Sequence, residues 1–310
     1  GGGVNRNVII NGNMTIAERA TSSTGIGGSS GYFVCDRWRI NTTTGGRLTM
    51  SQDSSAPSGF AKSLKLDCTT ADTSVASNES VILSQRIEGQ NLQAFAKGTP
   101  DAKPFAVSFY VKGNASATYI CELRDRDNSR SAGKTFNVTT DWTRVELTFD
   151  ADTTGSFDDD NARSLDFNIF LHAGTDKTSG TLSNTFTSEV AANRAGGLSS
   201  SFFDSTSRTF FITGVQLEVG QNPTEFEHEP HERTEMKCYR YYYKSSTYTL
   251  SLANAHDAGY SFRQERTQQH VMPVIMRSSP TATAVESAKL LNSGTITLHA
   301  NRDHIVIMPS

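Results

Sequence analysis

The sequence has no long hydrophobic run, no strong excess of either charge and no recognisable leader. No stretch of about 18 consecutive apolar residues occurs, which argues against a membrane-spanning helix. The start, GGGVNRNVIINGNM, lacks the apolar centre of a signal peptide, so we expect no secretory leader. With 29 basic and 32 acidic residues the net charge is −3, which gives no electrostatic case for binding nucleic acid.

Cysteine and tryptophan are scarce. We expect Trp38 and Trp142, the only tryptophans, to lie in the core or at its edge, because so large an aromatic ring contributes heavily to burial. No CxxC pair occurs, which argues against a zinc or thioredoxin-type site. We expect buried free thiols that behave as small apolar groups at all four cysteines: Cys35, Cys68, Cys121 and Cys238.

Familiar catalytic motifs are also missing. The sequence contains no H-E-x-x-H pair and no phosphate-binding glycine loop. Its G-x-S-x-G match, GGSSG (27–31), lies in a loop-like stretch rich in Gly and Ser and not between a strand and a helix, so it is no nucleophile elbow. Glu88 and Glu122 lie in strand-like segments, and they would serve glycoside hydrolysis only if a cleft held them about 5–10 Å apart. We therefore expect a protein that is not an enzyme and that needs no cofactor.

What the sequence does contain is a two-residue alternation of apolar and polar side chains. It recurs in residues 62–67, 104–112, 143–149, 165–171 and 208–218. Side chains at i and i+2 share one face of a sheet, so this pattern predicts half-buried antiparallel strands. Loops rich in Gly, Ser, Thr, Asn and Asp separate the strands and supply turns. We predict an all-β protein: a jelly-roll-like antiparallel β-sandwich followed by a smaller β domain.

Helical signal is weak and confined to short segments. Residues 91–97 are long enough for one or two turns, and residues 187–195 for a short helix within a long loop. Residues 232–242 have the composition of a helical turn that gives way to a strand. None of these segments changes the predicted class.

The chain changes character near residue 230. At 310 residues it is long enough for about two domains. The apolar strand that ends at Glu218 is followed by a charged segment containing Pro223 and Pro230. We predict a sandwich over 1–230 and a smaller C-terminal β domain over 231–310. Because its own core is thin, we expect this domain to pack on the first domain or on partner chains, and in the second case to mediate oligomerisation.

Several motifs then follow one another in a recognisable order. They are NVIINGNM (7–14), GYFVCDRWRI (31–40), LSQRIEG (83–89), KPFAVSFYVKG (103–113), DWTRVELTFDADTTGSF (141–157), FFITGVQLEVGQNPTEFE (210–227) and CYRYYYK (238–244). Their order and spacing resemble those of phage and prophage virion proteins of the tail-fibre or head-fibre type. PVIMRSSPTATAV (273–285) is similar to a strand pair near the ends of fibre proteins.

The resemblance implies a virion surface protein, often trimeric and often facing the host envelope. It also implies a first domain similar to jelly-roll carbohydrate-binding modules, which often hold a structural calcium ion between the chain start and the last strand. Here the acidic residues of that site are replaced by Met14–Thr15 and Thr213–Gly214. Since a hard cation needs carboxylate oxygens, we expect no calcium at that place.

The tyrosines near residue 240 are the main candidates for a ligand site. A strand there would put Tyr239, Tyr241 and Tyr243 on one face and their neighbours on the other. Tyrosine offers a flat ring and a polar tip, which suits glycan or protein contacts, whereas cross-strand packing is the alternative. The ligand-binding residues we single out are Tyr242, Tyr248, Tyr260 and Arg240.

Two further groups of residues contain side chains of the kind that bind metals. Asp158, Asp159 and Asp160 follow a glycine-containing turn, but their spacing does not match an EF-hand loop, and we favour a solvated loop. His228 and His231 are separated by a proline, which removes a helical donor, so we do not expect them to share a metal.

Taken together, the sequence favours a non-catalytic fibre or spike component of a bacteriophage virion, located at the tail or head surface. It would bind host cell-surface polysaccharide or a protein receptor through many weak contacts multiplied in a homotrimer, and it would contact other virion proteins. One alternative is a purely structural head fibre, decoration or joint protein. A second is a polysaccharide depolymerase or esterase, although the coil repeat of parallel β-helix tailspikes is absent. A third, a module of a secreted bacterial hydrolase, predicts a monomer.

Overall fold

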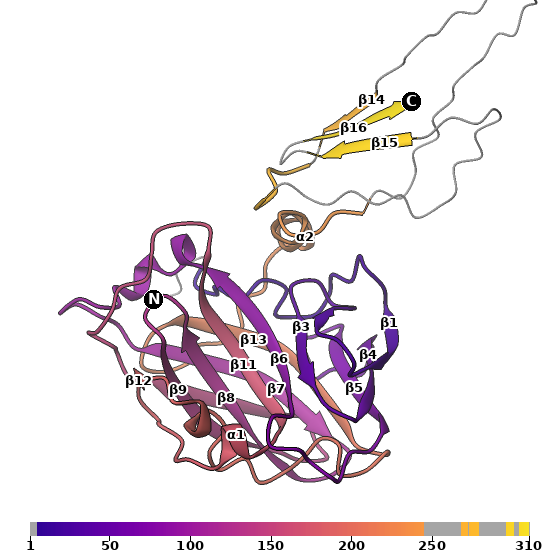
Figure 1. The fold of residues 1–310 in the computed structure, drawn as a ribbon. Coiled ribbons are helices and arrows are strands. Elements are labelled where there is room, and N and C mark those ends of the chain that lie inside the picture. Colours follow the sequence, from indigo (N-terminus) through magenta and orange to yellow (C-terminus); the bar gives the residue numbers. More distant parts are fainter. Residues whose placement is uncertain (1–4, 245–267, 272, 279–295, 301–303, 310) are drawn as a thin grey trace, which may run out of the picture. The chain divides into compact units, whose positions relative to one another are not determined.

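The computed structural model of the protein (Figure 1) describes the following residues: 5–244, 268–271, 273–278, 296–300 and 304–309. The chain divides into two compact units, unit 1 over 1–234 and unit 2 over 235–310. Among the helices in the described ranges, none is long and apolar enough to cross a membrane.

Unit 1 is built from two antiparallel sheets. Six strands form the first sheet, in the spatial order β1 (Ser22–Ile26), β4 (Arg47–Asp53), β5 (Ser63–Thr70), β13 (Thr209–Val219), β7 (Phe105–Gly113) and β10 (Thr143–Phe149). Seven strands form the second, in the order β12 (Thr187–Ser188), β9 (Arg130–Val138), β8 (Ala117–Asp125), β11 (Arg163–Ala173), β6 (Ser80–Glu88), β3 (Arg39–Thr43) and β2 (Gly31–Tyr32). The chain passes repeatedly from one sheet to the other. The predicted class, an all-β antiparallel sandwich, is confirmed.

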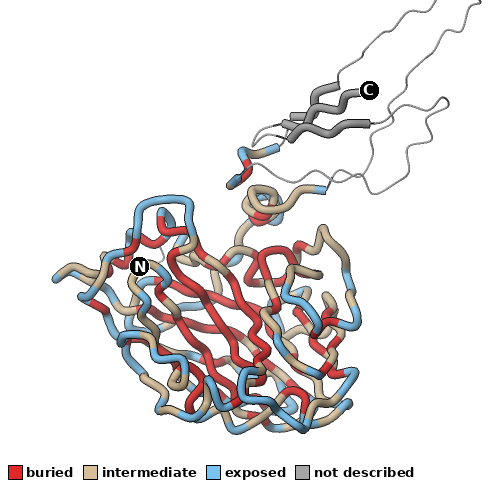
Figure 2. Tube along the Cα trace, in the orientation of Figure 1, coloured by how far each residue is buried: buried red, intermediate tan, exposed pale blue. Residues whose placement is uncertain are grey.

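The hydrophobic core of unit 1 lies between the two sheets. Along β11, Leu165, Phe167 and Ile169 point into the core because side chains alternate along a strand. Buried residues accordingly run along the central strands, and exposed residues gather in the loops (Figure 2). Trp38 is fully buried with its ring edge-on to Phe167 at 6.0 Å, as predicted. Trp142 is half-buried.

The cysteines follow the prediction as well. All four are buried, and none forms a disulfide. Burial raises the pKa of the Cys35 and Cys121 thiols, so both stay protonated at neutral pH. They act as small core residues.

The first and last segments of unit 1 are bonded side by side. The carboxylate of Glu227 accepts hydrogen bonds from the backbone N–H groups of Asn5, Arg6 and Asn7, at 2.5, 2.7 and 3.0 Å. Burial acts to raise the pKa of Glu227, but these donors outweigh it and the pKa is lowered. The sandwich is therefore closed by an ionised carboxylate that joins residues more than 200 positions apart.

Helices are short, as the weak signal predicts. The segment 91–97 forms parts of two 3-10 turns, η1 (Gly89–Asn91) and η2 (Gln93–Phe95). The segment 187–195 contains β12 and a third 3-10 turn, η3 (Ala191–Asn193), and α1 (Thr175–Thr178) lies shortly before them.

One predicted element is wrong. Residues 238–244 do not form a strand, because α2 (His231–Tyr239) continues to Tyr239 and a turn follows it. Thr234 and Cys238 are both buried and lie one helical turn apart, which is a helical spacing. The rings of Tyr239 and Tyr243 meet edge-on at 5.1 Å, whereas on an extended strand two residues four positions apart would be separated by about 13 Å.

Unit 2 contains a three-stranded antiparallel sheet in its described part. The order is β14 (Gln268–Val271), β16 (His304–Pro309) and β15 (Ile296–Ala300). The backbone N–H of Arg277 donates to the carbonyl of Arg240 at 2.9 Å, which ties the turn after α2 to a later segment of the same unit.

Candidate functional site

The outer face of the seven-stranded sheet is lined by polar side chains. The strand register sets Tyr32 opposite Arg39, Arg39 opposite Ser84, Ser84 opposite Asn168, and Asn168 opposite Glu122. Directly opposed residues of an antiparallel pair share one sheet face. These five residues therefore form one line, here called the polar row, across β2, β3, β6, β11 and β8 (Figure 1).

Hydrogen bonds hold the polar row in place. Asn41 donates from Nδ2 to Ser84 Oγ at 2.6 Å, and Asn168 donates from Nδ2 to Glu122 Oε2 at 2.8 Å. Arg194 donates to both carboxylate oxygens of Glu122 at 2.7 Å. Both oxygens of the buried Glu122 are thus occupied, and its charge is matched by a guanidinium.

A second line of charged residues runs beside the polar row. Arg86 lies opposite Asp166, and Asp166 lies opposite Arg124. Arg163 binds the Asp166 carboxylate through two nitrogens, and Arg124 Nη2 donates to Glu189 Oε1 at 2.6 Å. Asp166 and Arg124 therefore each have an ionic partner.

Arg86 differs from its neighbours. Its Nε is buried, and its side chain has no hydrogen bond or ion pair with any residue that the structure describes. Burial, followed by the nearby charges of Arg163 and Arg39, lowers the pKa of the Arg86 guanidinium. The Tyr32 ring lies close by, with the guanidinium carbons of Arg19 and Arg39 at 5.6 and 6.0 Å from its centroid. This end of the face combines an aromatic ring with positive charge that is not neutralised.

The apolar part of the same face is covered by a loop segment. Residues 174–198 lie over it, and a small hollow of about 10 Å³ remains beside Glu122 and Arg194. The covered patch consists of Ile82, Ile120 and Phe170, packed against Ala195, Leu182 and Leu198. The half-buried residues of β2, β3 and β6 are not part of this covered patch.

The tyrosines singled out from the sequence belong to unit 2. Tyr242 is half-buried in the segment after α2, and Arg240 Nη1 donates to the carbonyl of Ile275 at 3.4 Å. Tyr248 and Tyr260 lie outside the described residues. Their role in ligand binding stays a prediction, without the strand face on which it was based.

The acidic loop residues are bound into a turn. Asp158, Asp159 and Asp160 are exposed. The Asp160 carboxylate accepts from the backbone N–H of Ala162 at 2.8 Å, and the backbone N–H of Asp158 donates to Asp127 Oδ2 at 3.1 Å. In the described part of the chain these three carboxylates do not gather with other ligands into a group fit for a metal.

Other positions considered for metals are packed by neighbours. The His228 ring lies 5.2 Å from the Phe60 ring, and His231 is the first residue of α2. At the place of the calcium site that the resemblance suggests, Met14 is fully buried and the Thr213 hydroxyl donates to the Lys62 carbonyl at 2.7 Å. No carboxylate side chain belongs to either position.

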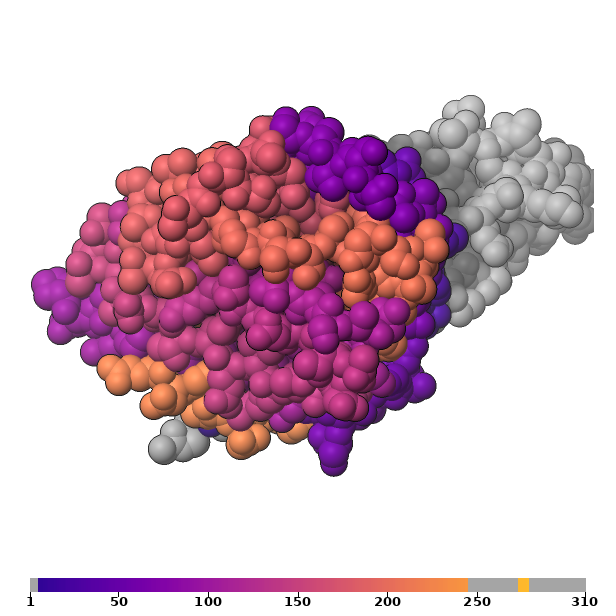
Figure 3. All heavy atoms as spheres, turned by 90° about the horizontal axis from the view of Figure 1, so that it is seen from below, coloured from indigo at the N-terminus to yellow at the C-terminus, as the bar shows by residue number. Residues whose placement is uncertain are grey.

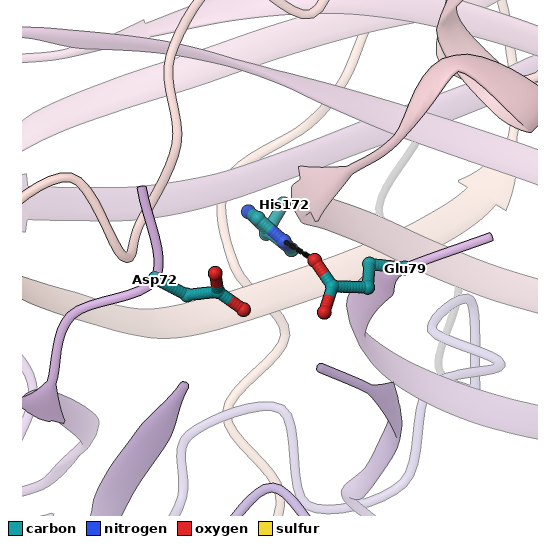
Figure 4. A group of neighbouring side chains, drawn as sticks. All are labelled: Asp72, Glu79 and His172. Atoms are coloured by element: carbon teal, nitrogen blue, oxygen red, sulfur yellow. Dashed lines mark ion pairs between the residues drawn. The ribbon is translucent and has the colours of Figure 1, made fainter. Parts of the chain in front are cut away.

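A different group of side chains has metal-ligand character. Asp72 and Glu79 from the β5–β6 loop and His172 near the end of β11 place one ligand atom each within 4.8 Å of one another. Figure 4 shows the three side chains directed toward a common point. Figure 3 shows a face of unit 1 on which early (purple) and late (salmon to orange) parts of the chain lie against each other, as they do in this group. We call Asp72, Glu79 and His172 the cation cluster.

Neither the polar row nor the cation cluster was predicted from the sequence. The polar row and the charged line beside it had a usable signal: Ser84 and Arg86, and likewise Asp166 and Asn168, are the polar halves of the alternation whose apolar halves predict the core. The cation cluster had none, because its members are separated by up to 100 positions and only the register of β11 on β6 brings His172 to the loop.

Comparisons with known proteins give only distant likenesses. No family model matches the chain, and no curated protein matches it. The solved structures that resemble it include one described as "CBM4 structure and function", at 12% identity over 68% of this chain and 98% of that chain, with a TM-score of 0.37. A putative sugar binding protein from Bacteroides thetaiotaomicron has 14% identity over 69% and 100%, with a TM-score of 0.38. The enzymatically active domain of tailspike protein 4 of bacteriophage CBA120 has 13% identity over 69% and 21%, with a TM-score of 0.34. Likenesses this distant do not define a function.

Proposed function

We propose that unit 1 binds a polysaccharide on the outer face of its seven-stranded sheet. The observation that carries this proposal is the half-exposed end of the polar row, Tyr32 and Arg39, with Arg86 beside it. The other members of the row, Ser84, Asn168 and Glu122, are buried and support this end from below. Guanidinium groups next to the Tyr32 ring suit a ligand that offers many hydrogen-bond acceptors and a flat sugar face. Strands also hold such groups in more fixed positions than loops do.

The charge of this face favours an acidic polysaccharide. Within the described residues, Arg39 and Arg86 have no carboxylate bound to them. A guanidinium binds a carboxylate or sulfate through two parallel hydrogen bonds, a geometry that a neutral sugar cannot match. Uronate or sulfate groups of a glycan are the expected partners of these arginines.

We propose binding without catalysis. Glu88 and Glu122 were the acids considered for hydrolysis, and both are buried. Arg194 takes both oxygens of Glu122, and Gln90 donates to Glu88 Oε2 at 2.5 Å. Carboxyl groups engaged in this way are poorly placed to protonate a glycosidic oxygen.

The biological setting we propose is a bacteriophage fibre or spike that attaches to a host surface glycan. Its support is the ordered series of motifs along the sequence, from NVIINGNM to CYRYYYK. Weak contacts on each chain would be multiplied in a trimer, where avidity replaces high affinity at a single site.

Binding of the full chain to polygalacturonate, an acidic polysaccharide, and to dextran, a neutral one, tests the proposal. We expect saturable binding to the acidic polymer that weakens with salt, and a loss of about 10–100-fold in Arg86→Ala, the range expected for losing a hydrogen bond to a charged group. Tyr32→Ala should weaken binding too. Lys112→Ala removes one positive charge from a strand of the other sheet and is the matched control, with affinity unchanged.

Three outcomes would count against the proposal in different ways. Equal affinity of wild type, Arg86→Ala and Tyr32→Ala, with circular dichroism showing all three folded, would rule out this face. Binding lost in Tyr242→Ala alone would move the site to unit 2. Preference for dextran would refute the acidic class of ligand.

A further inference from the structure

We propose that the cation cluster, Asp72, Glu79 and His172, binds a divalent transition-metal ion such as Zn²⁺, which joins the β5–β6 loop to the end of β11. This site is separate from the glycan-binding face proposed above. It also differs from the calcium position that the family resemblance suggests, because that position involves residues near 14 and 213.

The His172 side chain is the first argument. It is 1% exposed, and its Nε2 is buried without a hydrogen-bond partner among the described residues. Nε2 lies 3.7 Å from Glu79 Oε2, beyond hydrogen-bonding distance. A buried polar atom in this state costs free energy unless something binds it. A cation between the nitrogen and the carboxylates would satisfy it.

The other ring nitrogen of His172, Nδ1, has a hydrogen-bond partner, as the second nitrogen of a metal-bound histidine usually does. His172 Nδ1 lies 2.8 Å from Ser201 Oγ, and that oxygen also accepts the backbone N–H of Phe203 at 3.0 Å. When Nδ1–H donates to Ser201, Nε2 carries the lone pair and points toward the two carboxylates. Metal-bound histidines are usually oriented by such a hydrogen bond from the second nitrogen.

Backbone groups hold the two carboxylates in place. Asp72 Oδ2 accepts from Thr44 Oγ1 and the Gly45 N–H, both at 2.9 Å, and from the Gly46 N–H at 3.2 Å. These bonds leave Asp72 Oδ1 without a hydrogen bond among the described residues. The Gly45 N–H also donates to Glu79 Oε1 at 3.1 Å, so one donor links the two acids. The arrangement keeps two negative charges close together, which an ion would offset.

The donor set points to the class of ion. One imidazole nitrogen and two carboxylate oxygens suit Zn²⁺ or Mn²⁺, whereas Ca²⁺ and Mg²⁺ prefer oxygen ligands throughout. Bonds of about 2.0–2.2 Å would draw the three atoms inward from their present separations and leave a fourth position for water. Glu79 is 13% exposed, so the ion can enter from solvent.

Titration of the full chain with Zn²⁺ followed by calorimetry tests this proposal. We expect one Zn²⁺ per chain, a higher thermal midpoint with the ion, and affinity reduced at least 10-fold in Asp72→Asn and Glu79→Gln, which keep the side-chain shape. Asp159→Asn in the exposed acidic loop and His231→Gln are the matched controls, and both should bind as the wild type does.

X-ray absorption at the zinc edge provides a second measurement that does not depend on the variants. One imidazole with oxygen neighbours is the expected first shell, and a sulfur shell would overturn the site by assigning the ion to a cysteine. Absence of binding up to millimolar Zn²⁺, or equal affinity in the wild type and both ligand variants, would overturn it as well. Glycan binding does not enter either measurement, so the two proposals fail separately.

Discussion

The buried charged side chains of unit 1 differ in how many hydrogen-bond and ion-pair partners they have. Lys97 is fully buried, with Nζ at 2.6 Å from Asp125 and 3.1 Å from Asp152, and it donates to the carbonyls of Thr154 and Gly155. Such a set of partners is what offsets the loss of hydration of a buried ion. A buried charged group with fewer partners should have a shifted pKa, because its loss of hydration is not fully offset.

Asp36 is such a group. It is buried, its Oδ2 accepts the Glu18 backbone N–H at 2.7 Å, and Arg19 Nε stays 3.7 Å from its Oδ1. Burial raises the pKa of Asp36 to about 6, against the lowering effects of the Glu18 N–H, Arg19 and Arg37. The folded state therefore favours the protonated carboxyl. The stabilisation is complete below pH about 4 and is lost as the pH rises through about 6.

Replacement of this carboxyl gives a pH-dependent prediction. Relative to Asp36→Asn, the wild type should lose about 3 kcal/mol of unfolding free energy between pH 4 and pH 7. Urea unfolding of both proteins at several pH values measures the difference, and Asp101→Asn at an exposed position is the matched control. A difference between wild type and Asp36→Asn that stays constant over this range would contradict the prediction.

At the scale of single residues, the sequence predicts which side chains are buried better than it predicts which side chains could bind a ligand. Trp38 was assigned to the core from its size alone, and it is fully buried. Arg86 stands in an ordinary strand motif, LSQRIEG, and nothing in its sequence neighbours shows that Tyr32, Arg39 and Asp166 would surround it. Those neighbours come from the register of three other strands, which local sequence does not encode.

At the scale of elements, the segments that carry the family resemblance contact one another. Gln85 exchanges two hydrogen bonds with the backbone of Ile10, at 2.7 and 2.9 Å, and Trp38 Nε1 donates to the Asn11 carbonyl at 3.0 Å. Glu227 binds the N–H groups at the chain start. These contacts show that the segments build the scaffold, and Tyr32, Arg39 and Arg86, which we propose as ligand-binding residues, lie within two of them.

Regular strands were predictable and the tyrosine-rich segment was not. Alternation identifies β5, β7, β10, β11 and β13 because each turns one row of apolar side chains into the core between the sheets. The run CYRYYYK alternates in the same way, yet α2 extends to Tyr239. Its preceding residues, HERTEMK, are mostly good helix formers, and helix propagation continues into the start of the run.

The junction between β11 and α1 shows how tightly elements approach each other. Gly174 donates its N–H to the Glu79 carbonyl at 2.8 Å, and a Cβ on Gly174 would lie 2.0 Å from the carbonyl oxygen of Ala76. Gly174→Ala should lower the unfolding free energy by about 1–3 kcal/mol, because backbone must move to admit the methyl group. Urea unfolding measures this loss.

The matched control for this change is Gly28→Ala. A Cβ on Gly28 would meet only the end of the Arg47 side chain at 4.0 Å, so stability should stay the same or rise slightly. Equal unfolding free energies for wild type and Gly174→Ala would show that the β5–β6 loop yields easily to the new methyl group.

At the scale of the whole molecule, the large hydrophobic core cluster of the described residues lies within unit 1. The core cluster runs from Ile9 to Leu217, and the bonds of Glu227 to the chain start close it. Both the polar row and the cation cluster lie inside these limits. Folding of the sandwich, glycan binding and metal binding are therefore all expected to reside in residues 1–234.

This assignment predicts how the molecule responds to removal of residues 235–310. The fragment 1–234 should melt within a few degrees of the sandwich transition in the full chain, because its core is intact. If unit 2 assembles the proposed trimer, light scattering should find the full chain trimeric and the fragment monomeric. Binding to immobilised polysaccharide should then weaken by about 10²–10⁴-fold as avidity is lost, while single-site affinity in solution stays the same. A fragment that melts far below the full chain would instead show that the sandwich depends on unit 2, and a trimeric fragment would place the assembly surface on the sandwich itself.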